Sequence, residues 1–299
     1  MLYMRGCPRG WVGCGGSLWG CPHPPEKTVS GWTMWASTPT IIIQITMLVF
    51  VRRRRLYWLV YFCEKYDIMG DNERWIIMLE EKVFESIKYL VSYPEDFCAD
   101  KKYPLIVFLH GAGTRSDNTE SLRNNACFCN LKKRQARGYI LLAPLCSVNN
   151  WNEVMSSLIN LVGCARNLDY VDTKRVYLTG NSMGGYGTWE LASLRPDWFA
   201  SIMPVCGGGI KWMAYTLADV PVRTFHGLCD SVVDPIESLE MAKAVNRRGG
   251  HAELILFPKL EHNCWDKVYS TEDNYDWLLS FTTDRDKTLI EQYSGEYYG

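Results

Sequence analysis

Ser182 has the sequence surroundings of an enzymatic nucleophile. It lies at the centre of the run Gly180-Asn181-Ser182-Met183-Gly184, which follows an apolar segment and precedes a helical pattern. A G-x-S-x-G pattern between a strand and a helix is typical of a sharp turn that exposes the serine hydroxyl. Glycine at both ends leaves room for the neighbouring chain, and the N-terminus of the following helix favours negative charge. The segment therefore predicts a serine that attacks a carbonyl carbon.

Such a serine needs a base, and a histidine is the usual one. With this turn, the nucleophile, the acid and the histidine follow one another along the chain, and the histidine lies on the loop after the last strand. His262, in FPKLEHNCW, fits this order. His110 and His226 end predicted strands and are expected to make structural hydrogen bonds to backbone beneath the site. The two other histidines are His23 and His251.

The acid that orients the histidine is expected between them, at the end of the preceding strand. The run FHGLCDSVVDP offers two aspartates, Asp230 and Asp234. A short turn places Asp230 so that it can reach the loop of His262, whereas Asp234 lies where the next helix begins and suits an N-cap. Asp230 is preferred, and Asp234 stays open as the alternative. The acid would hold the imidazole in the productive tautomer.

An oxyanion hole is expected beside the serine. The turn Gly111-Ala112-Gly113 follows an apolar strand, and its amides can converge with that of Met183 on a carbonyl oxygen. The backbone N–H groups of Ala112 and Met183 are the predicted donors. The same glycines lack the lysine and the spacing of a phosphate-binding loop, so a nucleotide site is disfavoured.

Two tryptophans are candidates for an apolar wall that contacts the substrate. Trp151 lies in the loop after the third predicted strand, and Trp265 lies three residues beyond the histidine. Tyr186 and Trp189, on the helix after the serine, are expected in the core. No long insertion follows the serine turn, so the pocket is expected to be open. Contact of the two tryptophans with the substrate would favour a short acyl or aromatic ester over a long lipid.

Short β-branched runs alternate with amphipathic segments from about residue 75 onward. This alternation predicts an α/β fold: a mostly parallel, twisted sheet with helices on both faces and an antiparallel edge strand at its start. Predicted strands cover 83–92, 105–109, 139–143, 176–179, 202–205, 222–225 and 253–257, and predicted helices cover 152–167, 183–194, 236–248 and 273–281.

The composition of the 299 residues is that of a globular protein. Apolar residues make up 47% and charged residues 22%, enough for a large core. With 32 basic and 33 acidic side chains the net charge is -1, so nothing draws the chain to nucleic acid, and a small molecule is the expected partner. The 12 cysteines are scattered without the spacing of a zinc site and are interpreted as mostly buried thiols.

Residues 1–74 are predicted to be a separate, irregular N-terminal extension, with the catalytic domain at 75–299. The first 50 residues contain only four charged side chains, and residues 28–51 contain none. One interpretation is that residues 1–68 are absent from the native protein, which then begins at Met69 and is cytoplasmic. The alternatives are a membrane anchor over residues 28–51, followed by the basic run 52–55, or a small domain.

Six separate stretches, in order, carry a resemblance to a known family. They are YPLIVFLHGAG, LLAPLC, VDTKRVYLTGNSMGGYGTWELA, PVCGGG, FHGLCDSVVD and EHNCWDKVYSTEDNYDWLLS. Together they make residues 80–281 similar to the α/β-hydrolase superfamily, and within it to phospholipase/carboxylesterase and dienelactone-hydrolase-like bacterial esterases.

The resemblance implies a triad of Ser182, Asp230 and His262 and the hydrolysis of carboxylic esters without a metal or a cofactor. Asp234 stands where such proteins often have proline, and residues 1–74 have no counterpart. A serine peptidase, a thioesterase or a noncatalytic binding protein on the same scaffold are the alternatives.

Overall fold

The chain divides into two compact units, Met1–Arg74 and Trp75–Gly299. The computed structural model describes residues 79–284 with their side chains, and the backbone of residues 32–38, 41–52 and 55–65. The predictions that concern residues 1–31 and Met69 lie outside the described residues.

Three antiparallel strands make up the described part of the first unit: β1 (Trp32–Thr38), β2 (Ile41–Arg52) and β3 (Arg55–Lys65). These strands give regular structure to a segment that the sequence predicts to be irregular. The membrane anchor over residues 28–51 stays one of the alternatives. The β-branched residues of β2 favour an extended backbone. None of the helices in the described residues is long and apolar enough to cross a membrane.

The second unit is built on an eight-stranded sheet with the order β11-β10-β9-β8-β6-β7-β5-β4. Strands β6 to β11 are parallel, and β5 is antiparallel to both β4 and β7. The mostly parallel sheet with an antiparallel start confirms the predicted fold class. The strands are β4 (Leu79–Phe84), β5 (Ile87–Ser92), β6 (Tyr103–Leu109), β7 (Ile140–Pro144), β8 (Val171–Asn181), β9 (Ser201–Val205), β10 (Val222–Gly227) and β11 (Ala252–Phe257).

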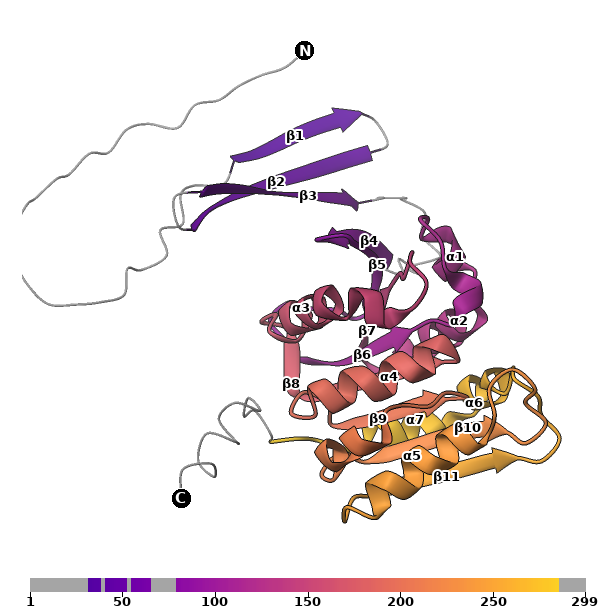
Figure 1. The fold of residues 1–299 in the computed structure, drawn as a ribbon. Coiled ribbons are helices and arrows are strands. Elements are labelled where there is room, and N and C mark those ends of the chain that lie inside the picture. The colour runs from indigo at the N-terminus through magenta and orange to yellow at the C-terminus, as the bar shows by residue number, and fades with distance from the viewer. Residues whose placement is uncertain (1–31, 39–40, 53–54, 66–78, 285–299) are drawn as a thin grey trace, which may run out of the picture. The chain divides into compact units, whose positions relative to one another are not determined.

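Helices cover both faces of this sheet (Figure 1). On one face α3 (Met155–Arg166), α4 (Met183–Leu194) and α5 (Ile236–Asn246) pack on the strands. On the other face lie α1 (Glu120–Arg123), α2 (Ala126–Lys133), α6 (Trp265–Ser270) and α7 (Glu272–Leu279). Short 3-10 turns are η1 (Ala112–Thr114), η2 (Gln135–Arg137), η3 (Trp151–Val154) and η4 (Lys211–Leu217).

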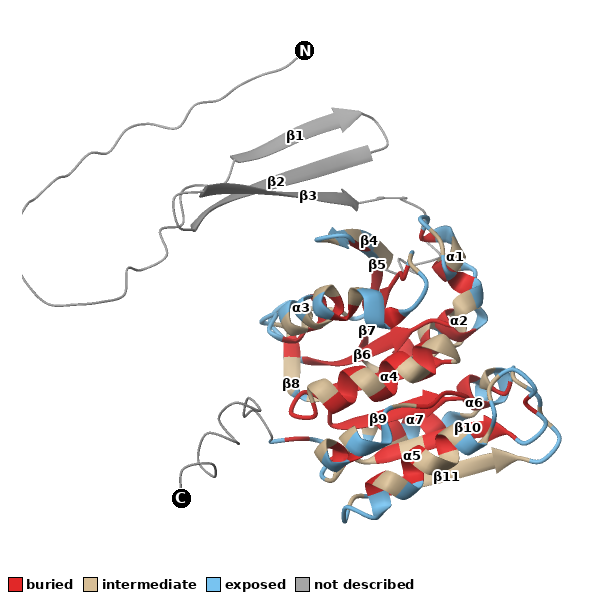
Figure 2. Cartoon of the chain, viewed as in Figure 1, coloured by how far each residue is buried: buried red, intermediate tan, exposed pale blue. Residues whose placement is uncertain are grey.

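The alternation of side chains along β6 divides the interior into two cores. Leu105, Val107 and Leu109 face the core under α3, α4 and α5, whereas Ile106 and Phe108 face the core under α2, α6 and α7. Because both faces are buried, the strand reads as a continuous apolar run. Figure 2 shows this as buried central strands between helices, of which α3 and α5 have exposed residues on their outer sides.

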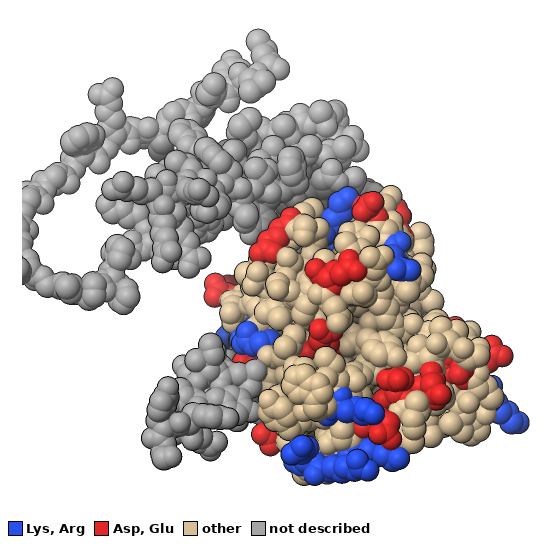
Figure 3. Space-filling model, in the orientation of Figure 1, with Lys and Arg blue, Asp and Glu red and all other residues tan. Residues whose placement is uncertain are grey.

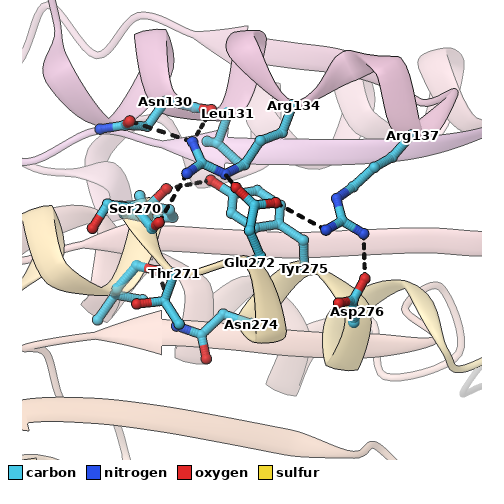
Figure 4. A network of polar contacts seen from close by, with 12 residues as sticks. Asn130, Leu131, Arg134, Arg137, Ser270, Thr271, Glu272, Asn274, Tyr275 and Asp276 are labelled. Carbon is cyan, nitrogen blue, oxygen red and sulfur yellow. Dashed lines mark hydrogen bonds and ion pairs between the residues drawn. The ribbon is translucent and has the colours of Figure 1, made fainter.

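Polar contacts join α2 and η2 to α7 on the second face (Figure 4). The Arg134 guanidinium lies 2.9 Å from a Glu272 carboxylate oxygen and donates to the Ser270 carbonyl oxygen at 2.9 Å. Arg137 pairs with Glu272 at 2.9 Å and also with Asp276. Elsewhere on the surface both signs of charge occur on the face drawn in Figure 3, in keeping with the balanced composition.

Candidate active site

Ser182 lies at the sharp turn between β8 and α4, and its backbone is strained. Its φ is 54° and its ψ is -119°, in the region that favours glycine. The turn packs directly on the end of β6: a Cβ atom at Gly184 would lie 1.8 Å from the carbonyl oxygen of Leu109. A Cβ atom at Gly180 would lie 2.4 Å from the carbonyl oxygen of Gly184. Only glycine fits at both positions.

His262 reaches Ser182 from the loop between β11 and α6. Its Nε2 lies 2.8 Å from the Ser182 Oγ. The backbone of this loop lies close to Gly227, the last residue of β10. A Cβ atom at Gly227 would lie only 2.3 Å from the carbonyl oxygen of Leu260. The structure thus brings together two residues that are 80 positions apart in the sequence.

Asp230 lies on the far side of the imidazole, after β10. Its Oδ2 accepts a hydrogen bond from the Nδ1 of His262 at 2.7 Å, and its Oδ1 accepts from the backbone N–H groups of Val232 and Val233, both at 2.9 Å. Burial acts to raise the pKa of the Asp230 carboxyl, but the hydrogen bonds from His262 and the two backbone groups hold the pKa below its usual value. The carboxylate form is therefore favoured.

Asp234 lies elsewhere. It is exposed, and its Oδ1 accepts from the N–H of Ile236, the first residue of α5, at 2.9 Å. Of the two acids that the sequence offers, the structure places Asp230 against His262.

The partners of His262 define its tautomer. Because a carboxylate only accepts, Nδ1 carries the proton, and Nε2 is left with a lone pair directed at the hydroxyl of Ser182. A continuous hydrogen-bond chain therefore runs from the hydroxyl through the imidazole to Asp230. It has the geometry in which a histidine removes a proton from a serine.

The two predicted oxyanion donors lie at the ends of segments that meet beside Ser182. Met183 is the first residue of α4, where N–H groups lack intrahelical acceptors. Ala112 begins η1, and a Cβ atom at the preceding Gly111 would lie 3.5 Å from the Cβ of Ser182. The loop after β6 thus touches the nucleophile turn.

His110 orients the peptide that carries the Ala112 N–H. The N–H of Cys146 donates to its Nε2 at 2.9 Å, so its Nδ1 carries the proton and donates to the Gly111 carbonyl oxygen at 2.8 Å. In a trans peptide the carbonyl and the N–H point in opposite directions, so the Ala112 N–H is turned away from the ring. Burial lowers the pKa of His110 to about 4, and the ring is neutral.

The two tryptophans have different surroundings. Trp151 is only 1% exposed, and its Nε1 donates to the His110 carbonyl oxygen at 3.1 Å. Its ring contacts the position of Gly187 on α4, so the prediction that Trp151 forms a wall of an open pocket is wrong: the residue is core. Trp265 is half-buried, with its ring centroid 5.2 Å from that of His262 at an interplanar angle of 87°.

His226 has a larger role in the site than the sequence suggests. The prediction of a backbone hydrogen bond is partly right, since its Nε2 lies 3.0 Å from the Val233 carbonyl oxygen. The same nitrogen also lies 3.0 Å from the Oδ2 of Asp230. No local sequence pattern marks this contact, because His226 is in β10 and Asp230 follows the turn after that strand. Among the described residues no cluster of His, Cys, Asp and Glu side chains is arranged to hold a metal ion.

Comparison with known proteins gives similarities to esterases and peptidases. No family model matches the chain. It is 33% identical to dipeptidyl-peptidase 5 of Aspergillus fumigatus over 122 residues, which cover 34% of this chain and 16% of that protein. It is 25% identical to "Probable feruloyl esterase C" of Aspergillus niger over 186 residues, 60% of this chain and 69% of that protein. The chain thus spans a small part of the curated dipeptidyl peptidases that it matches.

A solved structure with a similar fold is that of a thermostable esterase. It aligns with a TM-score of 0.61 at 24% identity and covers 84% of this chain and 76% of that one. In this chain the strand order, the parallel strands β6 to β11 and the serine turn between β8 and α4 point to the same fold class. The chain has the α/β-hydrolase fold.

Proposed function

We propose that this chain is a serine hydrolase that cleaves carboxylic esters through an acyl-enzyme. The observation that carries the proposal is the hydrogen-bond chain from the Ser182 Oγ to His262 and on to the buried Asp230. The similarities to esterases in sequence and in fold support it. These similarities concern other proteins, and the substrate class is inferred here.

In the proposed reaction, the Ser182 Oγ attacks the ester carbonyl while its proton passes to the Nε2 of His262. Asp230 stabilises the imidazolium that forms. The backbone N–H groups of Ala112 and Met183 would bind the oxygen that becomes negative. The imidazolium then gives its proton to the leaving alcohol, and His262 activates the water that hydrolyses the acyl-enzyme.

The proposed substrate is an ester with a short acyl or an aromatic group. Trp265 is the apolar side chain that lies against the catalytic imidazole, edge to face. Its indole would form one wall for the substrate. Trp151 has no part in this proposal, since it is buried.

A fluorophosphonate probe and a series of aryl esters test the proposal. The wild-type chain should be labelled at Ser182 and should hydrolyse nitrophenyl esters. Ser182→Ala should not be labelled and should lose activity by about a millionfold, as in subtilisin, without a change in thermal stability. Ser156→Ala, a change on the exposed side of α3, is the matched control. Ester hydrolysis that survives in Ser182→Ala would refute the assignment.

A peptidase on the same scaffold is the second candidate, because the chain matches part of a dipeptidyl peptidase. Matched ester and amide substrates with the same acyl group separate the two. An amide turned over as fast as its ester would favour the peptidase. A wild-type chain that the probe does not label would instead indicate a noncatalytic binding protein.

A further inference from the structure

His226 is a buried histidine that the proposed reaction does not use. It is the residue before the last in β10, and its side chain is fully buried. Its ring bridges the loop that follows β10 and the helix α5: Nε2 faces Asp230 and Val233, and Nδ1 faces the hydroxyl of Ser238 at 2.7 Å.

The neighbours of Nε2 define its protonation. Both oxygen atoms within 3.0 Å of it, the Asp230 Oδ2 and the Val233 carbonyl oxygen, only accept hydrogen bonds when Asp230 is ionised. Nε2 therefore carries a proton and shares it between these two acceptors. His226 donates to the carboxylate from Nε2, whereas His262 donates to it from Nδ1.

Asp230 consequently accepts four hydrogen bonds. Its Oδ1 takes the two backbone N–H groups of Val232 and Val233, and its Oδ2 takes one imidazole N–H from His262 and one from His226. His262 lies on a different loop and is the group that changes charge during the proposed reaction. His226 is the donor that holds Oδ2 from within the buried interior, independently of His262.

The other end of the ring is anchored to the nucleophile side of the site. The Ser238 Oγ lies 2.7 Å from the Gly207 carbonyl oxygen. Gly207, in turn, packs on α4, because a Cβ atom at Gly185 would lie 3.2 Å from its Cα. A chain of contacts therefore runs from Asp230 through His226 and Ser238 to the helix that begins after Ser182.

We propose that His226 is a positioning residue of this site: it holds the Asp230 carboxylate in the orientation that meets His262, and it takes up part of the charge of Oδ2. This inference rests on the proposed function. His226 touches neither the substrate nor the reacting atoms, so it acts only through Asp230.

His226 also affects the charge that Asp230 presents to His262. A second donor on Oδ2 reduces the negative charge that His262 experiences, and so disfavours its protonated form. Activity should therefore persist to lower pH with His226 present than without it. The titratable groups that face Asp230 are His262 after β11, Cys206 after β9 and Tyr186 on α4. Glu237 on α5 faces Tyr186.

Two substitutions of His226 show whether its hydrogen bond to Asp230 or only its side-chain volume matters for activity. His226→Gln keeps an N–H near the position of Nε2, whereas His226→Met has a similar volume and no donor. His226→Met should lower kcat for a nitrophenyl ester by at least about tenfold, leave KM within about twofold because no substrate contact is lost, and move the acidic limb of the kcat/KM profile to higher pH. His226→Gln should restore most of kcat, and His251→Gln, an exposed position, is the control.

The inference is overturned if His226→Met and His226→Gln have equal kcat and equal pH profiles at equal thermal stability. If His226→Met does not fold, neutron diffraction from crystals of the wild-type chain decides. A deuterium on the Nε2 of His226, directed at Asp230, is expected, and a bare Nε2 contradicts the inference. Labelling by the fluorophosphonate probe tests the proposed function separately, because a labelled chain whose His226 variants resemble the wild type refutes only this inference.

Discussion

Replacing Asp230 with asparagine places a group that both donates and accepts where the structure needs only an acceptor. Four N–H groups converge on the carboxylate, two on each oxygen. The amide of asparagine has one oxygen and one NH2 group, so in either orientation its NH2 group meets two donors. The change keeps the shape of the side chain and removes only its charge and half of its accepting capacity.

Each orientation has its own consequence. If the NH2 group faces the two imidazoles, His262 must accept at Nδ1, so its proton moves to Nε2, and Nε2 no longer accepts from Ser182. If the NH2 group faces Val232 and Val233, two buried backbone donors lose their partner, at a cost of about 1–3 kcal/mol each. The first orientation costs less free energy, because an imidazole can change its tautomer whereas a backbone N–H group cannot lose its proton. We expect kcat to fall by about 10⁴-fold, as for the same change in the serine-protease triad.

The assay is steady-state hydrolysis of a nitrophenyl ester, with thermal unfolding measured on the same preparations. Asp234→Asn is the matched control: Asp234 is exposed, and the asparagine oxygen can accept the same hydrogen bond from the Ile236 N–H. Its kcat should stay within about twofold of the wild type, because Asp234 makes no contact with His262. The reasoning fails if Asp230→Asn keeps more than a tenth of the wild-type kcat. A loss confined to Asp234→Asn would make Asp234 the acid.

Two predictions concern the stability of the scaffold around the site. Gly184→Ala should lower the thermal midpoint strongly, because its Cβ would lie 1.8 Å from the Leu109 carbonyl oxygen, whereas Gly113→Ala, with open space around it, should not; equal midpoints would contradict the contact. Because burial lowers the pKa of His110 to about 4 from 6.5, the unfolded chain binds the extra proton first as the pH falls. Because of His110, the free energy of unfolding should therefore decrease as the pH falls from 6.5 to about 4, by up to about 3 kcal/mol. Urea unfolding of His110→Gln should show a smaller decrease over that range.

The features of this fold that local pattern determines were predictable from the sequence. The predicted helix 183–194 has the bounds of α4, because a glycine turn starts it and a continuous apolar pattern follows. The order of the strands β6 to β11 and of the helices α3, α4 and α5 between them also follows from the sequence, since each strand contains a short apolar run. The positions of Ser182, Asp230 and His262 at strand ends could be predicted because parallel strands present their carboxyl ends at one edge.

Features that depend on contacts between distant segments were not predictable in this way. The predicted strand 83–92 is a hairpin of β4 and β5, and its turn has Glu85 at a φ of 51° without a glycine or a proline to mark it. The burial of Trp151 depends on the meeting of η3, β6 and α4, which no local pattern records. The short helices α2 and α6 were missed because one or two turns carry little periodicity.

The precision of the site comes from its backbone more than from its side chains. Two neighbouring strands each end in a non-glycine residue with positive φ, Ser182 at 54° after β8 and Cys206 at 41° after β9. Such residues cost about 1–3 kcal/mol each and persist only where the surroundings fix them. Here the Ser182 N–H donates to the Val205 carbonyl oxygen at 2.9 Å, and the Cys206 N–H donates to the Phe225 carbonyl oxygen at 2.8 Å.

These two hydrogen bonds tie β8, β9 and β10 together at the edge where the serine and the acid emerge. The glycines beside them allow backbone to meet backbone, since a Cβ atom at Gly185 would lie 2.6 Å from the Val205 carbonyl oxygen. A side chain at this contact could change rotamer, whereas two backbone segments packed directly on each other have only one relative position. The strain at Ser182 is therefore held by three strands at once, and the hydroxyl meets the imidazole of His262 without any movement of the sheet.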